Sequence, residues 1–358
     1  MNWIIDNDYL IGSSKNFKFD FKQTKKLALF DLDNTIIKTK SNKVFPCDYT
    51  DWIFNYDNTK EILHNYIDND YCIIIISNQS QLKNNQTKIN DWIKKINNIQ
   101  KKLNIELKIF CSTSHNKYRK PLPSFYNEFI QIENKEHIFY CGDAGGRKND
   151  FADTDLKFAL NCMIKFKYPE EVFLNINNPD KTLSLKPLIP YVNFSINKIE
   201  HIIKQNDKEI VILVGYPASG KSYIAKKYHK LNYVIINQDT LKTKTKCIKI
   251  FNNALSNQSS IIIDNLNPDY ETRKFWIQCA KKHNYKTKII QMTTDINLSK
   301  HNNLYRMYKH NKKYIPNIVY NIYNKKYEKP SYKIDKVDII EYVHFVFPND
   351  YEYFYYMY

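Results

Sequence analysis

The sequence predicts an α/β protein made of two doubly wound domains, each built on a parallel sheet. Short apolar runs alternate with longer segments of mixed polarity, which is typical of parallel strands covered by helices on both faces. This alternation occurs twice, on either side of an irregular stretch at residues 175–207, and the chain of 358 residues is long for a single core. We therefore predict a first domain at residues 1–190, a linker at 191–207 and a second domain at 208–358.

Four apolar runs in the first half are interpreted as strands: "LALF", "CIIIIS", "LKIF" and "HIFYCGD". Segments of helical character, such as Thr87 to Leu103, lie between them. Three runs end in a polar residue, namely Asp31, Ser77 and Asp143. Ligands of doubly wound sheets bind at the carboxyl ends of the strands. We expect these three side chains to converge on one crevice.

The second half repeats the pattern with the runs "EIVILV", "YVIINQD", "SSIIIDNLN", "YKTKIIQM" and "KVDIIEYVHFVF". It ends in an aromatic tail, "YEYFYYMY", and no internal repeat is visible. These runs predict a second parallel sheet with its own covering helices.

The chain has a formal net charge of +17. Such a surplus favours a polyanionic partner, nucleic acid or an anionic membrane, although a generally lysine-rich surface would give the same number. The seven cysteines show no CxxC pair, which argues against disulfides and a zinc cluster and for a reducing compartment. We expect no signal peptide, because "MNWIIDNDYL" lacks a charged start followed by a long apolar core, and no apolar run approaches about 18 residues. We expect a soluble intracellular monomer that does not bind membranes, in the nucleus or the cytoplasm.

The stretch "FDLDNT" places Asp31 at the tip of a predicted strand and Asp33 just beyond it. A carboxylate in such a position can attack phosphorus and form an aspartyl-phosphate, with Mg²⁺ neutralising the charge between them. The second carboxylate can protonate the leaving alcohol and then activate water. Taken alone, the motif is equally compatible with an ordinary polar turn.

Further residues in chain order support the catalytic interpretation. Ser77, with its neighbour Asn78, can bind a phosphoryl oxygen, and Lys120 supplies a cation. Asp143 can bind Mg²⁺ together with the two aspartates of "FDLDNT", and Asp150 and Asp155 follow as secondary candidates.

The second signature is "GYPASGKS", which directly follows a predicted strand and has the GxxxxGKS pattern of a phosphate-binding P-loop. Its backbone N–H groups would wrap the phosphates of ATP, Lys221 would reach the β- and γ-phosphates, and Ser222 would bind Mg²⁺. The predicted ATP-binding residues of the loop are Gly215, Tyr216, Pro217, Ala218, Ser219, Gly220, Lys221 and Ser222.

Four downstream residues could complete a phosphotransferase site. Asp239, in "NQDT", could accept a proton from an attacking hydroxyl, with a helix cap or a surface turn as the less favoured alternative. Asp264 follows an apolar run in the manner of a Walker B carboxylate, and Arg273 comes soon after it. Arg306 could close over the γ-phosphate as a lid residue.

The order DxDxT, S, K and GDxxGR resembles the haloacid dehalogenase-like phosphatases. More narrowly, "FDLDNTIIKTKSNKVFP", "SNQ", "YRKP" and "GDAGGRKNDF", together with "GYPASGKS", "NQDT" and "HNNLYR", resemble the polynucleotide kinase 3′-phosphatase family. The resemblance covers most of the chain and implies Asp31 as nucleophile and Asp33 as acid and base. It also implies that Ser77 and Lys120 bind phosphate, Asp143 the metal, and that Mg²⁺ and ATP are cofactors.

The chain departs from this family pattern at four places. Asn34 stands where Gly is usual, and we expect Asn to tolerate the turn. The loop around Asp150 is shorter than in animal relatives. Gln238 and Leu304 stand where arginines are common, so ATP binding is better supported than kinase activity. The phosphopeptide-binding module of animal relatives is not expected.

The leading hypothesis is a bifunctional end-healing enzyme for nucleic-acid strand-break repair, with DNA as the expected substrate. It would hydrolyse 3′-phosphates and phosphorylate 5′-hydroxyls from ATP. One alternative is a 3′-phosphatase or nucleic-acid-binding repair factor with a degenerate kinase site. Another is a small-metabolite phosphatase fused to a small-molecule kinase, which the charge disfavours.

Overall fold

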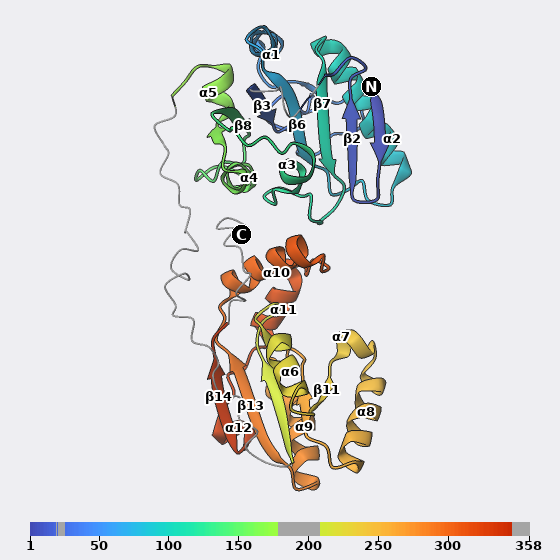
Figure 1. Ribbon diagram of the computed structural model, residues 1–358, viewed down its shortest axis with the longest axis vertical. Helices are drawn as coiled ribbons and strands as arrows, with labels where there is room; N and C mark the ends of the chain where they lie inside the picture. Colours follow the sequence, from blue (N-terminus) through green and yellow to red (C-terminus); the bar gives the residue numbers. More distant parts are fainter. Residues whose placement is uncertain (19, 21–25, 178–207, 346–358) are drawn as a thin grey trace. The chain divides into compact units, whose positions relative to one another are not determined.

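The computed structural model describes residues 1–18, 20, 26–177 and 208–345, and the chain divides into two compact units (Figure 1). Each unit contains its own sheet of five or more strands. The predicted linker at 191–207 and the aromatic tail at 351–358 lie outside the described residues. The proposed domain boundaries therefore remain a prediction.

The first unit is built on a seven-stranded sheet with the order β1-β2-β7-β6-β3-β8-β9. The five strands from β7 to β9 pair in parallel, and each of the four apolar runs predicted in the first half forms one of the central strands. The strands are β1 (Asn2–Ile5), β2 (Tyr9–Ser13), β3 (Lys26–Phe30), β6 (Cys72–Asn78), β7 (Leu107–Ser112), β8 (His137–Cys141) and β9 (Lys165–Lys167). A separate two-stranded sheet consists of β4 (Ile37–Lys38) and β5 (Ile53–Phe54).

The strands β1 and β2 were not predicted. They form an antiparallel hairpin, and β2 also pairs antiparallel with β7, so the otherwise parallel sheet has an antiparallel edge. Trp3 of β1 packs edge-on against Trp92, which anchors this edge to the helix layer.

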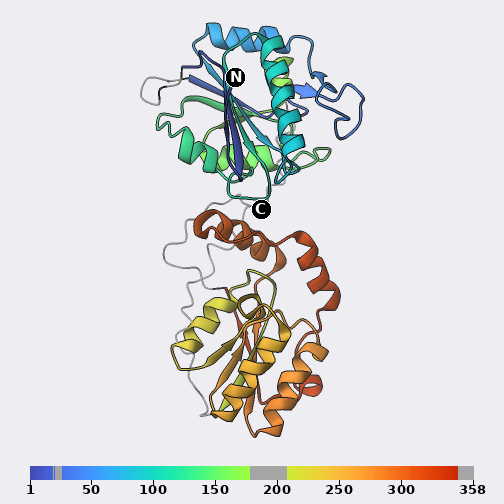
Figure 2. The same ribbon diagram turned by 90° about the vertical axis from the view of Figure 1, so that its right-hand side faces the viewer.

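Helices cover both faces of the first sheet, as can be followed in Figure 2. One face packs against α1 (Thr59–Asp68), α2 (Gln86–Leu103) and α5 (Pro169–Phe173), and the other against α3 (Ser124–Phe129) and α4 (Thr154–Cys162). In α2 the apolar side chains recur every three or four residues, which buries one stripe of the helix. Asn85 caps its first turn by accepting a hydrogen bond from the Lys88 backbone N–H at 3.0 Å.

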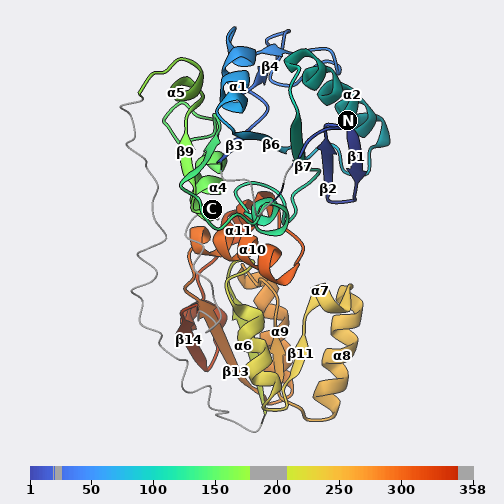
Figure 3. The same cartoon turned by 45° about the horizontal axis from the view of Figure 1, so that its top comes forward.

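The second unit contains a five-stranded sheet that is parallel throughout, with the order β11-β12-β10-β13-β14. All five predicted runs form its strands: β10 (Glu209–Val214), β11 (Val234–Ile236), β12 (Ile261–Ile263), β13 (Lys286–Met292) and β14 (Ile339–Val343). The helices of this half are α6 (Lys221–His229), α7 (Gln238–Leu241), α8 (Lys244–Ser256), α9 (Tyr270–Lys282), α10 (Ile296–His310), α11 (Asn317–Lys326) and α12 (Tyr332–Asp335). As Figure 3 shows, α6 lies over one face, and the core contacts place α8 and α9 on the other.

The predicted fold class is confirmed, because both units are α/β layers around mainly parallel sheets. The strands β6, β3 and β8 are neighbours, so Ser77, Asp31 and Asp143 all lie at one carboxyl edge. Among the described residues, no helix is long and apolar enough to cross a membrane.

Candidate active sites

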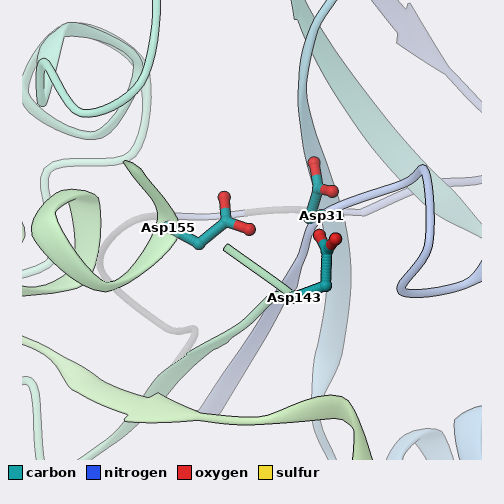
Figure 4. Close-up of side chains that lie close together, drawn as sticks. All are labelled: Asp31, Asp143 and Asp155. Atoms are coloured by element: carbon teal, nitrogen blue, oxygen red, sulfur yellow. The ribbon is translucent and has the colours of Figure 1, made fainter. Parts of the chain in front are cut away.

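Three carboxylates gather at the carboxyl edge of the first sheet (Figure 4). Asp31 directly follows β3, Asp143 comes two residues after β8, and Asp155 lies in the first turn of α4. One oxygen from each lies within 4.8 Å of the others. Figure 4 shows the three side chains turned toward one another.

The backbone around this cluster fixes the positions of the carboxylates. The Asp31 N–H donates to the Cys141 carbonyl at 2.8 Å, which extends the β3–β8 pairing by one residue. The Ala144 N–H donates to Asp155 Oδ2 at 3.1 Å. Gly142 leaves the room that Asp155 needs, because a Cβ there would lie 2.3 Å from the same oxygen.

Lys120 is the cation of the cluster, and only 3% of its surface is exposed. Its Nζ lies 2.5 Å from Asp31 Oδ1, 2.7 Å from Asp155 Oδ1 and 2.6 Å from the Tyr140 hydroxyl. Burial alone lowers the pKa of Lys120, but the charges of Asp155 and Asp31 outweigh it, so the pKa is raised and the ammonium is retained.

One ammonium does not balance three clustered carboxylates. Burial raises the pKa of Asp31 well above its usual range, although Lys120 opposes this effect. Burial and the charge of Asp155 raise the pKa of Asp143 to about 6. The negative charge of the three carboxylates is only partly neutralised by Lys120, and carboxylate oxygens are the ligands that Mg²⁺ prefers. The cluster therefore fits that ion. Of the three predicted ligands, Asp31 and Asp143 belong to this group, and Asp155 joins them.

The Asp33 carboxylate lies outside this group. Gln79 Nε2 donates to its Oδ2 at 2.6 Å, and Lys95 Nζ lies 3.4 Å from its Oδ1. About half of the Asp33 side chain is exposed, so it is accessible to solvent.

Ser77 is buried at the end of β6, as predicted for a phosphate ligand. The side chain of Asn78 holds the backbone of Lys120. Its Nδ2 donates to the Lys120 carbonyl at 3.1 Å, and its Oδ1 accepts from the Lys120 N–H at 2.9 Å. Asn78 therefore supports Lys120, and its role in phosphate binding stays a prediction.

The P-loop forms the turn between β10 and α6. Gly220 has a φ of +100°, and a Cβ there would lie 3.1 Å from the Phe345 ring, so glycine suits this position. Lys221 Nζ donates to the Gly215 carbonyl at 2.8 Å and also to the Tyr216 carbonyl. The ammonium is therefore held in the mouth of the loop, where a bound phosphate would lie.

The surroundings of the loop include most of the other predicted residues. Asp264 is buried one residue beyond β12 and accepts from Asn237 Nδ2 at 2.9 Å, while Asp239 is exposed in the short helix that follows β11. Ser222 is exposed in the first turn of α6, next to Lys221.

The helix α10 packs on the P-loop through its N-terminal half. Asn302 Nδ2 donates to the Ala218 carbonyl at 3.2 Å. Arg306 follows one turn later, which places it on the same helix face as Asn302. Leu304 is half-buried in the same helix.

Comparison with known proteins agrees with the presence of a carboxylate cluster and a P-loop in one chain. The family model of the polynucleotide kinase 3 phosphatase matches residues 26–173. The bifunctional polynucleotide phosphatase/kinase of Schizosaccharomyces pombe is 36% identical over 337 residues, which cover 92% of this chain and 82% of that protein. The chain belongs to the family of bifunctional polynucleotide phosphatase/kinases.

Two further relatives match a smaller part of the chain. The polynucleotide 3′-phosphatase of Saccharomyces mikatae is 32% identical over 45% of the chain and 90% of its own length. That of Saccharomyces cerevisiae is 31% identical over 40% of the chain and 85% of its own length.

Two secondary candidates have structural roles in this chain. Arg273 is fully buried and forms a two-pronged ion pair with Asp335, so it is not available to ATP. Asp150 pairs with Arg147 at 2.9 Å and also accepts backbone N–H groups of its own loop, so it shapes the loop after Asp143.

The family departure at Asn34 is explained by its backbone and its side chain. Its φ is +58°, a conformation that Asn tolerates better than most residues with a side chain. Its side chain also hydrogen-bonds to Asp143, which a glycine could not do.

Three residues near the first site were not predicted from the sequence: Gln79, Lys95 and Tyr140. Only Gln79 is adjacent in sequence to a predicted residue.

Proposed function

We propose that this chain heals the ends of broken nucleic acid, removing 3′-phosphates at the first site and phosphorylating 5′-hydroxyls from ATP at the second. The observation that carries the proposal is the Asp31–Lys120 pair beside Asp143 and Asp155, in a chain that also has a complete P-loop. The names of the related proteins supply the substrate class. The products, a 3′-hydroxyl and a 5′-phosphate, are the ends that a ligation reaction needs.

In the phosphatase reaction, a carboxylate oxygen of Asp31 bonds to phosphorus while the bond from phosphorus to O3′ breaks. Asp33 gives its proton to the departing O3′. Water then attacks the aspartyl-phosphate, Asp33 takes the proton from that water, and inorganic phosphate leaves Asp31. Lys120 and Ser77 bind the phosphoryl oxygens throughout. When Mg²⁺ is bound, Asp31, Asp143 and Asp155 would hold it, and it supplies positive charge between nucleophile and phosphate.

In the kinase reaction, Asp239 accepts the proton of the 5′-hydroxyl as its oxygen bonds to the γ-phosphorus and the bond to ADP breaks. The loop backbone and Lys221 bind the ATP phosphates, and Arg306 covers the γ-phosphate. Ser222 and Asp264 are the candidate ligands for the Mg²⁺ that accompanies ATP. The exposure of Asp239 supports this role, because a polynucleotide end must reach it.

A second candidate function is a 3′-phosphatase with a degenerate kinase site. Gln238 favours it, because this residue stands where relatives often have arginine and offers no cation to an incoming strand.

We propose DNA as the preferred substrate and a monomer as the active form.

Two single substitutions test the two-site model. Asp31→Asn should abolish release of phosphate from a 3′-phosphate oligonucleotide and leave ATP-dependent 5′-labelling unchanged. Lys221→Ala should do the reverse. The substrates are nicked, gapped and single-stranded DNA and RNA. Loss of both activities in one folded variant would contradict separate sites, and wild-type protein that fails to label a 5′-hydroxyl would favour the phosphatase-only function.

A further inference from the structure

The carboxylate of Asp33 is held through both of its oxygens by residues from two different elements. Gln79, just after β6, donates to Oδ2 at 2.6 Å, and Lys95 of α2 lies 3.4 Å from Oδ1. A carboxylate has about four lone-pair sites, so one contact on each oxygen leaves a further site for a proton. Asp33 is thus fixed in direction through both of its oxygens.

The position of Lys95 has no simple explanation in folding. Lysine side chains usually lie at the surface, but only 7% of the Lys95 side chain is exposed. The ammonium points to Asp33, whose side chain is 48% exposed and lies 62 residues away in sequence. By contrast, Lys94 and Lys101 of the same helix are exposed. Burying a lysine for one partly exposed partner adds little to stability.

Gln79 connects the proton carrier to the phosphate site. The Nε2 atom that donates to Asp33 also lies 3.0 Å from Ser77 Oγ. One side-chain amide therefore spans the two groups that, in the proposed reaction, face the bridging oxygen and the phosphoryl oxygens. A shift of this amide would move Asp33 relative to the phosphate.

We propose that Lys95 and Gln79 are positioning residues of the 3′-phosphatase reaction, which aim the Asp33 carboxyl at the O3′ leaving group. The inference rests on the proposed function. In this proposal both residues act through Asp33 and do not bind the phosphate themselves. Their contribution is greatest where the leaving oxygen most needs a proton, because an alkoxide such as O3′ is a poor leaving group and nitrophenolate is a good one.

The test compares Lys95→Met, Lys95→Arg and Gln79→Leu with the wild-type full chain on two substrates. On a 3′-phosphate oligonucleotide, Lys95→Met and Gln79→Leu should lower kcat about 10- to 100-fold with little change in KM, as is common for groups that orient a reacting residue. In a single-turnover burst with p-nitrophenyl phosphate, both should stay within about threefold of wild type, because the first step needs little proton donation. Lys95→Arg should recover most of the lost activity.

The matched control is Lys101→Met, which removes the same charge from an exposed position of α2 and should leave both rates unchanged. The 5′-kinase rate of each variant reports whether the rest of the chain is intact. Equal losses on both phosphatase substrates, or no loss on the oligonucleotide, would overturn the positioning role.

The proposed function can fail separately from this inference. Wild-type protein that releases nitrophenol but leaves the oligonucleotide 3′-phosphate intact would show that the polynucleotide substrate is wrong. The same variants are then compared on a simple alkyl phosphate, whose leaving group needs the same proton. A selective loss on that substrate would still support the roles of Lys95 and Gln79, and equal losses would reject them.

Discussion

At the scale of single residues, the charge of Asp143 depends on pH in the range just below neutrality. Burial and the neighbouring Asp155 raise its pKa to about 6 in the metal-free protein. Its charged form is therefore disfavoured in the fold, and the resulting loss of stability develops as the pH rises from about 4, its value in an unfolded chain, to 6. A bound divalent cation would reverse this effect.

We expect Asp143→Asn to stabilise the metal-free protein by about 1 to 2 kcal/mol at pH 8, because it removes a poorly solvated charge from a cluster of carboxylates. Near pH 3.5, where Asp143 is mostly protonated in both the folded and the unfolded chain, the difference from wild type should nearly vanish. Thermal melts in EDTA across this pH range measure it.

Addition of Mg²⁺ provides the control for this substitution. The wild type should gain thermal stability at pH 8, the variant should gain much less, and the variant should lose 3′-phosphatase activity. A variant that is less stable than wild type in EDTA at pH 8 would contradict the electrostatic account.

At the first site, the sequence allows prediction of the residues that lie at the ends of strands. Asp31, Ser77 and Asp143 were predictable because parallel strands end at one edge, and the family pattern supplied Lys120. Asp155 could be named only as a secondary candidate, because its place in the cluster depends on how α4 returns its first turn to that edge. The role of Lys95 could not be predicted at all, because nothing in the sequence of a lysine-rich helix distinguishes it from Lys94.

At the scale of elements, a buried ion pair joins two helices of the second unit. Arg273 of α9 binds both oxygens of Asp335 at the end of α12, with Nε–Oδ1 and Nη2–Oδ2 distances of 2.7 and 3.3 Å. The same guanidinium donates to the carbonyls of Asn267, Pro268 and Glu328. It therefore ties the loop after β12 to the segment before α12.

We expect Arg273→Met to destabilise the second unit by about 3 to 5 kcal/mol, because it leaves Asp335 charged, buried and without its cation. The double variant Arg273→Met with Asp335→Leu should regain part of this loss. Urea unfolding followed by tryptophan fluorescence measures both, since Trp276 lies in the same helix as Arg273. If the single substitution costs less than about 1 kcal/mol, the ion pair is not a main connection between these elements.

Strand prediction succeeded where burial is strongest. The central strands of both sheets are covered on two faces, so they are apolar throughout and stand out in the sequence. The hairpin of β1 and β2 escaped prediction because it is an edge, where Ile4 and Ile5 are more than half exposed and the run is interrupted by a polar turn. Its pairing with β7, about 100 residues away, depends on tertiary packing.

At the scale of the whole molecule, the net charge of +17 favours a polynucleotide over a small phosphate ester as substrate. Binding of a polyanion releases the cations condensed on it, so affinity falls with salt in proportion to the number of phosphates contacted. A small phosphate ester has no such atmosphere and should bind with much weaker salt dependence.

We therefore expect KM for a 3′-phosphate oligonucleotide to rise steeply with KCl, while KM for p-nitrophenyl phosphate hydrolysed by the same site changes little. Contact with about four phosphates of a single strand gives a slope near −3 in the logarithm of affinity against that of salt, or about 50-fold between 50 and 200 mM. Shortening the oligonucleotide below the contacted length should flatten this slope, because fewer cations are released. Parallel salt dependence for both substrates would instead indicate a general effect of salt on the catalytic site, and the positive charge would then have no role in holding the strand.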